Sequence, residues 1–406
     1  MSEWKEVQLN EICDLIAGYA FKSKDFGNYP TKVLKIADIN PPFVSSEKSS
    51  GVDLSNYDVD KLEKYIVKKG DYILAMTGAT IGKMGRYVSD GHAYLNQRVL
   101  KFQPYQSIDS DFLYYVLCGR LFAKYIINHI DSESAQPNIS AGTIGKYRFN
   151  LPNFETQQKI ASILSSLDSK IENNRKICAN LEAQAQALFK HWFIDFAPFK
   201  DGKFVESELG MIPEGWRVGT LEDLGKIICG KTPSKANKSY YGSDIPFIKI
   251  PDMHENVFIL KSEDNLSIEG SNSQLNKMIP EFSIMVSCIA TVGLVAMNVK
   301  PSHTNQQINT IVPFQSCYRY YVYENLKLRY KELLMLGSSG TTTYNVNTRT
   351  FSSLKVLVPE LRVIEDFNNV IKSHFEKILN LYQESSRLST LRDTLLPKLM
   401  SGAINV

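Results

Sequence analysis

Two long stretches of the chain carry apolar residues at the spacing of a long helix. From Ile160 to Trp192 the positions on one face follow each other at alternating intervals of four and three residues, which is the heptad spacing of a coiled coil. The apolar residues assigned to this stripe are Ile160, Leu164, Leu167, Ile171, Leu181 and Leu188. A second stretch, 207 residues later, keeps the spacing with Phe367, Ile371, Ile378, Leu381, Leu388 and Leu395. The pattern predicts two long helices.

A helix from about residue 156 to 193 would be roughly 55 Å long, and an apolar stripe of that length needs a partner. The obvious partner is the second helix, and antiparallel packing would relate the two by a pseudo-two-fold axis. The alternative is that each helix packs only against its own globular domain. Asn174 and His374 interrupt the stripe; they either fix the register of the pair or lie at its solvated edge.

The remainder of the chain has a different pattern. Short apolar and β-branched runs such as "YIVKKGDYILAM", "QRVLKF" and "YRFNLP" are separated by Gly, Pro, Asn and Asp, which is typical of strands joined by turns. The segment 110–127, "SDFLYYVLCGRLFAKYII", has a helical pattern. We therefore expect an α+β protein with strand-rich domains and two long helices.

The chain is also an internal duplication. Trp4 and Trp216 are 212 residues apart, as are Gly18 and Gly230, while "QPNIS" at 136–140 corresponds to "TYNVN" at 343–347. The matches keep their order and the offset falls from 212 to 207, as expected for repeats with slightly different loops. We predict a first strand-rich domain at 1–152, a helical spacer at 153–200, a second strand-rich domain at 201–358 and a second spacer at 359–406.

Composition narrows the classes of function. The 406 residues carry a net charge of only +3, and residues 1–150 hold 18 basic and 17 acidic residues. A uniformly basic DNA-coating protein is excluded, so any nucleic-acid site must be a local patch. The six cysteines and six histidines are scattered, which predicts no metal site. Neither a membrane-spanning run nor a signal-peptide core is present, and we expect a cytoplasmic protein.

One tetrapeptide suggests an enzyme. Asn40-Pro41-Pro42-Phe43 resembles the catalytic motif of DNA adenine-N6 methyltransferases. Such enzymes also need a glycine-rich loop of the F-x-G-x-G kind for S-adenosylmethionine, and the sequence has none. In the second repeat the corresponding position is "HENVF". We interpret the tetrapeptide as a Pro-Pro turn that ends a strand.

Phosphate and nuclease chemistry have equally little support. "GATIGKMG" at 78–85 is one residue shorter than a P-loop and lacks its Ser or Thr. It is either a tight hairpin, a backbone approach to DNA phosphate, or both. Pro251-Asp252 is followed by no acidic-x-Lys triplet within thirty residues, so we predict no catalytic residue.

Three segments carry a resemblance to a known family. "LPNFETQQKIASILSSLDSKIENNRK", "FVESELGMIPEGWRVGTLEDL" and the closing "LSTLRDTLLPKLMSGAINV" are similar, in the same order, to the specificity subunits of type I restriction–modification enzymes. The resemblance implies a non-catalytic subunit in which each of two target-recognition domains reads one half of an asymmetric, split double-stranded DNA site. It implies an antiparallel coiled coil that spaces the domains and docks two methyltransferase subunits.

The resemblance also implies further partners and where their cofactors lie. Restriction and translocation subunits would complete the nuclease. S-adenosylmethionine would belong to the methyltransferase subunits, ATP and magnesium would belong to the restriction subunit, and this chain would hold no cofactor. Two other functions stay open, a self-sufficient adenine-N6 methyltransferase and a coiled-coil scaffold without a DNA role.

Base readers are expected among Arg, Lys, Asn and Gln in loops, and phosphate contacts among Lys, Arg, Ser and Thr. In the first domain the candidates are Lys22, Lys24, Lys83, Arg86, Asn96, Gln97, Arg98, Gln136 and Asn138. In the second domain they are Lys231, Lys235, Lys238, Asn305, Gln306, Gln307, Thr341, Thr342, Tyr344 and Arg349. Because the Asn-Gln pairs at 96/97 and 305/306 recur in both repeats, they could instead be structural hydrogen-bonding residues.

Overall fold

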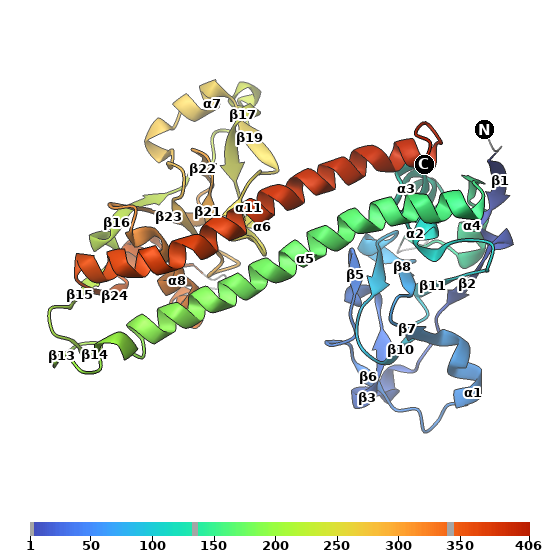
Figure 1. Ribbon diagram of the computed structural model, residues 1–406, viewed down its shortest axis with the longest axis horizontal. Coiled ribbons are helices and arrows are strands. Elements are labelled where there is room, and N and C mark those ends of the chain that lie inside the picture. The colour runs from blue at the N-terminus through green and yellow to red at the C-terminus, as the bar shows by residue number, and fades with distance from the viewer. Residues whose placement is uncertain (1–3, 132–136, 339–344) are drawn as a thin grey trace. The chain divides into compact units, whose positions relative to one another are not determined.

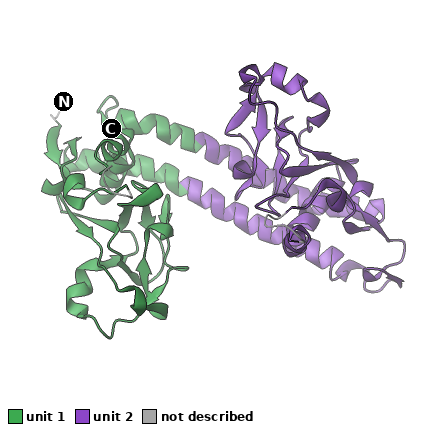
Figure 2. Cartoon of the chain, turned by 180° about the vertical axis from the view of Figure 1, so that it is seen from behind, with its two compact units in different colours: residues 1–169, 388–406 green, residues 170–387 purple. Residues whose placement is uncertain are grey.

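The computed structural model describes residues 4–131, 137–338 and 345–406. The chain divides into two compact units, one made of Met1–Ser169 with Leu388–Val406 and the other of Lys170–Arg387 (Figure 2). Two helices of 40 residues, α5 (Phe154–Phe193) and α11 (Leu361–Met400), are labelled in Figure 1, and each contributes to both units (Figure 2). Each unit therefore consists of a strand-rich domain with part of each long helix.

Unit 1 is built around two sheets. The larger has the strand order β2 (Cys13–Ala17), β11 (Val99–Pro104), β8 (Tyr72–Ala75), β9 (Met84–Tyr87), β5 (Phe43–Val44), β4 (Ile39–Asn40). The smaller has the order β6 (Gly51–Val52), β3 (Phe26–Leu34), β10 (His92–Leu95), β7 (Ile66–Lys68). A separate antiparallel pair joins β1 (Lys5–Gln8) to β12 (Arg148–Leu151).

The central strand β8 of unit 1 is buried on both faces. Tyr72 and Leu74 belong to the core that includes α2 (Ser110–Cys118) and α3 (Arg120–Asn128). Ile73 and Ala75 belong to a second core with residues of the smaller sheet, because successive side chains of a strand point to opposite faces. The short helices α1 (Val59–Leu62) and α4 (Ala141–Gly145) complete the unit. The helix expected over 110–127 is divided at Gly119, which is extended.

Unit 2 repeats this topology. Its larger sheet has the order β16 (Gly225–Cys229), β23 (Ile308–Pro313), β20 (Ile284–Ser287), β21 (Val295–Asn298), β18 (Phe258–Ile259). Its smaller sheet has the order β19 (Asp264–Leu266), β17 (Tyr241–Ile248), β22 (His303–Thr304). β15 (Arg217–Thr220) pairs with β24 (Lys355–Val358), and β13 (Phe204–Ser207) with β14 (Gly210–Pro213). The helices are α6 (Ile250–Met253), α7 (Ile268–Asn272), α8 (Tyr318–Leu328), α9 (Tyr330–Gly337) and α10 (Thr348–Ser352).

The duplication is confirmed element by element. β1 begins at Lys5 and β15 at Arg217, 212 residues later, whereas α5 and α11 begin 207 residues apart. In both units the fifth strand of the larger sheet, β5 or β18, runs parallel to its neighbour β9 or β21. The predicted α+β class, with two strand-rich domains related by duplication, is therefore confirmed.

The two long helices pair antiparallel within each unit. In unit 1 Asp168 contacts Arg392, and in unit 2 Asn174 contacts Glu384 while Phe189 packs against Phe367. As the residue number rises along α5 it falls along α11, which confirms the predicted antiparallel pair. Six of the predicted stripe residues are buried, namely Ile160, Leu164, Phe367, Ile371, Ile378 and Leu381. The other six are half-buried, namely Leu167, Ile171, Leu181, Leu188, Leu388 and Leu395.

The two long helices also pack against the domains. Ile160 and Leu164 share a core with Leu113 of α2, and Phe375 stacks on Tyr320 of α8 with ring centroids 4.3 Å apart. The predicted helix pairing and its alternative, packing on the strand-rich domain, therefore occur together. The part of the chain that the structure describes contains no helix both long and apolar enough to cross a membrane.

Candidate nucleic-acid interface

Three segments that are distant in the sequence of unit 1 meet where strands β2, β11 and β8 of its larger sheet end or begin, here called the edge of the sheet. The N–H of Tyr19 donates to the carbonyl of Leu95 (2.9 Å), and the N–H of Met76 donates to the carbonyl of Arg98 (3.0 Å). The N–H of Ile139 donates in turn to the carbonyl of Met76 (3.0 Å). Residues 96–98, here called strap 1, therefore lie between the segment that follows β2 and the β8–β9 hairpin.

Unit 2 repeats this row of contacts at equivalent positions. Lys231 N–H donates to the carbonyl of Thr304 (2.9 Å), Cys288 N–H to that of Gln307 (2.8 Å), and Val346 N–H to that of Cys288 (2.8 Å). Residues 305–307 form strap 2. The structure thus brings the candidates Lys231, strap 2 and the segment leading to Arg349 onto one edge, as it does for their counterparts in unit 1.

A glycine in each repeat permits this close packing. A Cβ built on Gly18 would lie 2.2 Å from the carbonyl oxygen of Asn96, and one built on Gly230 would lie 2.2 Å from that of Asn305. Neither distance can accommodate a side chain, since the obstacle is backbone. The recurrence of Gly18 as Gly230 therefore reflects the packing of each strap against the end of β2 or β16.

The candidates in strap 1 and beside it present polar groups to solvent. Gln97 and Arg98 are exposed and Asn96 is half-buried, while Lys83 is exposed in the β8–β9 hairpin. Asn138 is exposed and forms an isolated bridge with Thr77 of that hairpin. Gln136 lies outside the described residues.

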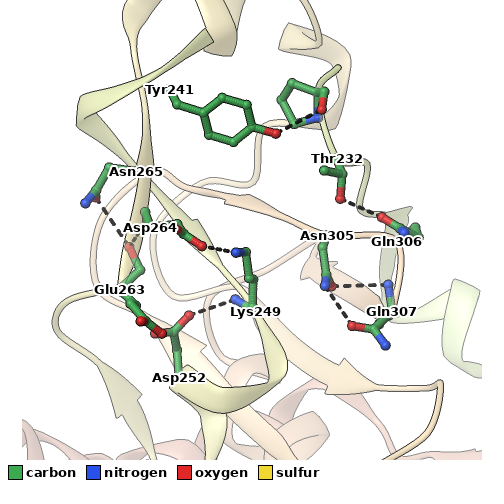
Figure 3. Close-up of polar contacts among 12 residues, drawn as sticks. Thr232, Tyr241, Lys249, Asp252, Glu263, Asp264, Asn265, Asn305, Gln306 and Gln307 are labelled. Atoms are coloured by element: carbon green, nitrogen blue, oxygen red, sulfur yellow. Dashed lines mark hydrogen bonds and ion pairs between the residues drawn. The ribbon is translucent and has the colours of Figure 1, made fainter. Parts of the chain in front are cut away.

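In strap 2 the three amide side chains have different surroundings (Figure 3). Asn305 is buried and donates from Nδ2 to Oε1 of Gln307 (2.9 Å), and the N–H of Gln307 donates to Oδ1 of Asn305 (3.2 Å). Gln306 is exposed, and its Oε1 accepts a hydrogen bond from the Thr232 hydroxyl (2.6 Å). Thr341, Thr342 and Tyr344 lie outside the described residues.

Three candidates of the first domain lie elsewhere. Arg86 is at the opposite end of the β8–β9 hairpin from Lys83, and its guanidinium carbon lies 5.8 Å from the centre of the Tyr72 ring. Lys22 and Lys24 flank and enter the short helix η2 (Ser23–Asp25), where the N–H of Lys22 donates to the hydroxyl of Tyr57 (3.0 Å). Arg86 therefore lies in β9 of the larger sheet, whereas Lys22 and Lys24 directly precede β3 of the smaller sheet.

The exposed candidate cations of both domains are well suited to polyanion contacts. Lys83, Lys231 and Arg349 are in the segments beside the straps, Lys235 is in the loop that follows Lys231, and Lys238 begins the short helix η8 (Lys238–Tyr240) before β17 of the smaller sheet. Lys83, Lys231, Lys235, Lys238 and Arg349 are all exposed. None of these five forms an ion pair with another residue in the described ranges, whereas Lys61, Lys69 and Lys355 do. Charges that are not neutralised within the protein remain available for phosphate groups.

The sequence motifs that suggested enzymes have structural roles. Asn40 and Phe43 face each other in the β4–β5 hairpin, and the carbonyl of Pro42 accepts the N–H of Arg86 (2.9 Å). Asp252 accepts the N–H of Lys249 (2.8 Å) and of Glu263 (3.0 Å). Among the residues that the structure describes, no group of three His, Cys, Asp or Glu side chains has the arrangement of a metal site.

Sequence reasoning missed the residues that support strap 2. Thr232 contacts Gln306 directly, Gln274 donates from Nε2 to the carbonyl of Lys231 (3.0 Å), and His303 contacts Ser271 through Nε2 (2.8 Å). His303 is fully buried, and burial lowers the pKa of its imidazole to about 4. In the sequence, the position of His303 directly before Thr304 and Asn305 could have linked it to strap 2, but it did not indicate Ser271 as its partner.

Comparison with known proteins places this arrangement in a family. The chain belongs to the family described as the type I restriction modification DNA specificity domain, which it matches over residues 1–183 and 213–381. The two matched regions correspond to the two repeats.

Relatives match along the full chain. The chain is 38% identical to the type I restriction enzyme HindI specificity subunit of Haemophilus influenzae, over the whole of both proteins. It is 28% identical to the MjaIX specificity subunit of Methanocaldococcus jannaschii, over 95% of this chain and 96% of that protein. The crystal structure of a type I S subunit from M. genitalium has the same fold, with a TM-score of 0.58 at 15% identity, covering 98% of this chain and 96% of that one.

Proposed function

We propose that this chain is the DNA-reading subunit of a type I restriction–modification complex and that each strand-rich domain reads one half of an asymmetric, bipartite double-stranded DNA target. One observation carries the proposal. Straps 1 and 2 are held by the same backbone hydrogen bonds, but the side chains on and beside them differ. Arg98 of strap 1 stands where strap 2 has Gln307, and Ala20, in the segment beside strap 1, stands where unit 2 has Thr232. A common frame with different base-reading groups is the arrangement needed for two different half-sites.

The partners follow from the family. We propose that the paired helices α5 and α11 set the half-site spacing and dock two methyltransferase subunits, with restriction and translocation subunits joining them. The chain itself has no catalytic role, in keeping with the lack of an F-x-G-x-G loop for S-adenosylmethionine in its sequence. S-adenosylmethionine then belongs to the methyltransferase, and ATP and magnesium belong to the restriction subunit. The complex works in the cytoplasm, where the DNA is.

The test is co-expression with a type I methyltransferase subunit from the same genome, followed by mapping of N6-methyladenine across the host genome. We expect a split motif. Exchange of residues 201–358 for the second domain of a relative should change one half of the motif and leave the other intact. A motif that changes in both halves, or no split motif at all, would overturn the proposal.

Two rival functions give different results in simple assays. A self-sufficient methyltransferase would bind S-adenosylmethionine as the purified chain, which equilibrium dialysis measures. A scaffold without a DNA role would not retain DNA even with the methyltransferase present. The exposed cations beside both straps, which form no ion pair with a described residue, favour DNA binding over the scaffold.

A further inference from the structure

Gln306 is the residue of strap 2 whose amide is directed outward. Asn305 donates from Nδ2 to Oε1 of Gln307, and its own Oδ1 accepts the backbone N–H of Gln307, so the Asn305 amide and the Gln307 amide oxygen are engaged within the strap. Gln306 is exposed and its Oε1 is held by the Thr232 hydroxyl. Because that hydroxyl occupies one lone pair of Oε1, the amide is fixed with its Nε2 donors turned away from Thr232 (Figure 3).

Thr232 is itself held on both sides. The carbonyl before it, of Lys231, accepts from Nε2 of Gln274 (3.0 Å), and the carbonyl after it, of Pro233, accepts from the Tyr241 hydroxyl (2.9 Å). Gln274 is buried and reaches Nδ1 of His303 (3.5 Å), whose Nε2 contacts Ser271 (2.8 Å). A buried polar network of this kind fixes the loop, and with it the position of the Thr232 hydroxyl.

The described residues of the first repeat provide no equivalent support. Gly18 corresponds to Gly230, so Ala20 occupies the position of Thr232 and Gln97 that of Gln306. Alanine has no hydroxyl to hold the Gln97 amide. The orienting contact therefore belongs to the second domain alone and does not arise merely from the duplicated frame.

We propose that Gln306 reads a hydrogen-bond acceptor on a base edge in the half-site of the second domain, and that Thr232 is the positioning residue that orients its amide. This inference rests on the proposed function of unit 2 in DNA reading. In the major groove, acceptors are purine N7, guanine O6 and thymine O4. Adenine is the best match, because its N6 amino group can also use the free lone pair of Gln306 Oε1.

The experiment uses the complex with its methyltransferase and maps methylated motifs for four variants. Thr232→Val removes the hydroxyl at nearly constant shape, Thr232→Ser restores it, and Gln306→Glu keeps the length but removes both N–H donors. Ser234→Ala, at an exposed position of the same loop, is the matched control. Circular dichroism melts of all four check that the fold is kept.

We expect Thr232→Val to relax one base position of the second half-site by roughly 10-fold in relative methylation rate, since a good bidentate base contact discriminates by about 1–3 kcal/mol. Thr232→Ser should restore the preference, and Gln306→Glu should lose or change that base. The first half-site should be unaffected. Unchanged motifs for both Thr232→Val and Gln306→Glu would overturn the inference while the proposed function stands. A wild-type complex without a split motif would overturn both.

Discussion

Nη1 of Arg392 donates a hydrogen bond to Oδ1 of Asp168 at a distance of 2.6 Å. This contact joins α11 to α5 in unit 1. The other oxygen of Asp168 accepts the hydroxyl of the buried Tyr115 from α2 (2.7 Å). Burial opposes the charge of Arg392, but its hydrogen bond to Asp168 and the attraction of that carboxylate raise the pKa of the guanidinium. A polar network thus replaces an apolar pair at this point of the stripe and ties both helices to the strand-rich domain.

Removal of the Asp168 charge should destabilise the protein measurably. The Asp168 and Arg392 side chains are 32% and 29% exposed, so solvent screening reduces the effect, and we expect Asp168→Asn to cost about 1–2 kcal/mol. Urea denaturation of the purified chain measures this. The control is Glu155→Gln, which breaks an exposed pair with Lys159 and should cost less than about 0.5 kcal/mol. Equal losses for the two variants would contradict a structural role for the network.

The periodicity of the sequence was sufficient to predict both long helices and their pairing, because a heptad stripe is a local pattern. It did not indicate that Phe375 would stack on Tyr320 or that Ile160 would share a core with Leu113. Those contacts depend on how the domains fold back on the helices, which residue spacing does not encode. The polar stripe position Asn174 was predicted as one that could set the register, and it donates to Glu384 (2.7 Å) and Ser385 (3.3 Å).

The close packing of Gly18 against strap 1 gives a second prediction. In Gly18→Ala the new Cβ would meet the Asn96 carbonyl oxygen at 2.2 Å, so the strap or β2 must move, and overpacking of this kind costs about 1–3 kcal/mol. We expect loss of preference in one half of the methylated motif together with a lower Tm. Gly142→Ala is the control, because its Cβ would meet nothing closer than 3.8 Å. A Gly18→Ala complex with normal specificity would show that the strap is not part of the reading surface.

The location of the candidate site could be predicted from the sequence only in part. The segments around Lys83, Gln97 and Asn138 were identified as separate polar loops, and the order of strands in the larger sheet brings them together. Arg86 is only three residues beyond Lys83, but it lies at the other end of a hairpin. Sequence distance therefore gave a misleading indication of spatial proximity. The supporting contact of Thr232 with Gln306 spans 74 residues, and no local pattern reports such a pair.

Salt dependence tests the cations at the edge of unit 1. Lys83 is exposed and forms no ion pair with a described residue, so a phosphate contact would release one counterion on binding. Lys83→Ala should weaken binding of target and non-target DNA alike and reduce the slope of log K against log salt by about 0.9. Fluorescence anisotropy of the assembled complex over a salt series measures the slope. Lys61→Ala, whose ammonium already pairs with Asp58 (2.9 Å), is the control, and an equal change in both variants would exclude a phosphate role for Lys83.

Glu324 should make the stability of unit 2 dependent on pH. It is almost fully buried in α8, and one of its carboxylate oxygens has no hydrogen-bond partner among the described residues. Burial, and secondarily the charge of Glu182, raises its pKa from 4.5 to about 8, although Lys327 opposes the shift. The unfolded chain releases this proton above pH 4.5 while the folded chain keeps it until about pH 8. The stability that unit 2 gains from keeping Glu324 protonated is therefore fully present below pH 4.5, and it is lost as the pH rises toward about 8.

Thermal melts between pH 5 and 8 measure this loss. We expect the wild-type Tm to fall across the window by roughly 5 °C, for a loss on the order of 2 kcal/mol, and the fall to be smaller in Glu324→Gln, which cannot ionise. Glu281→Gln, at an exposed position of the same unit, should follow the wild type. Parallel curves for wild type and Glu324→Gln would mean that Glu324 is already ionised in the folded protein.

The paired helices offer a direct test of the proposed spacing role. Because α5 and α11 run antiparallel, with Asn174 opposite Glu384 and Ser385, removing residues 171–177 together with 381–387 deletes one heptad from each helix at facing positions. A whole heptad preserves the phase of the stripe, so Cys178 and Ile378 should still pack together, and each helix shortens by about 10 Å. At about 3.4 Å per base pair, the gap between the half-sites should shrink by up to about three base pairs while both half-sites keep their sequence. Methylome mapping of the assembled complex measures this change directly.

The control is a deletion of four residues from α5 alone. Because its apolar stripe would then no longer face that of α11, this deletion should abolish assembly. If the paired heptad deletion assembles and methylates a motif with the original gap, the helices do not set the spacing.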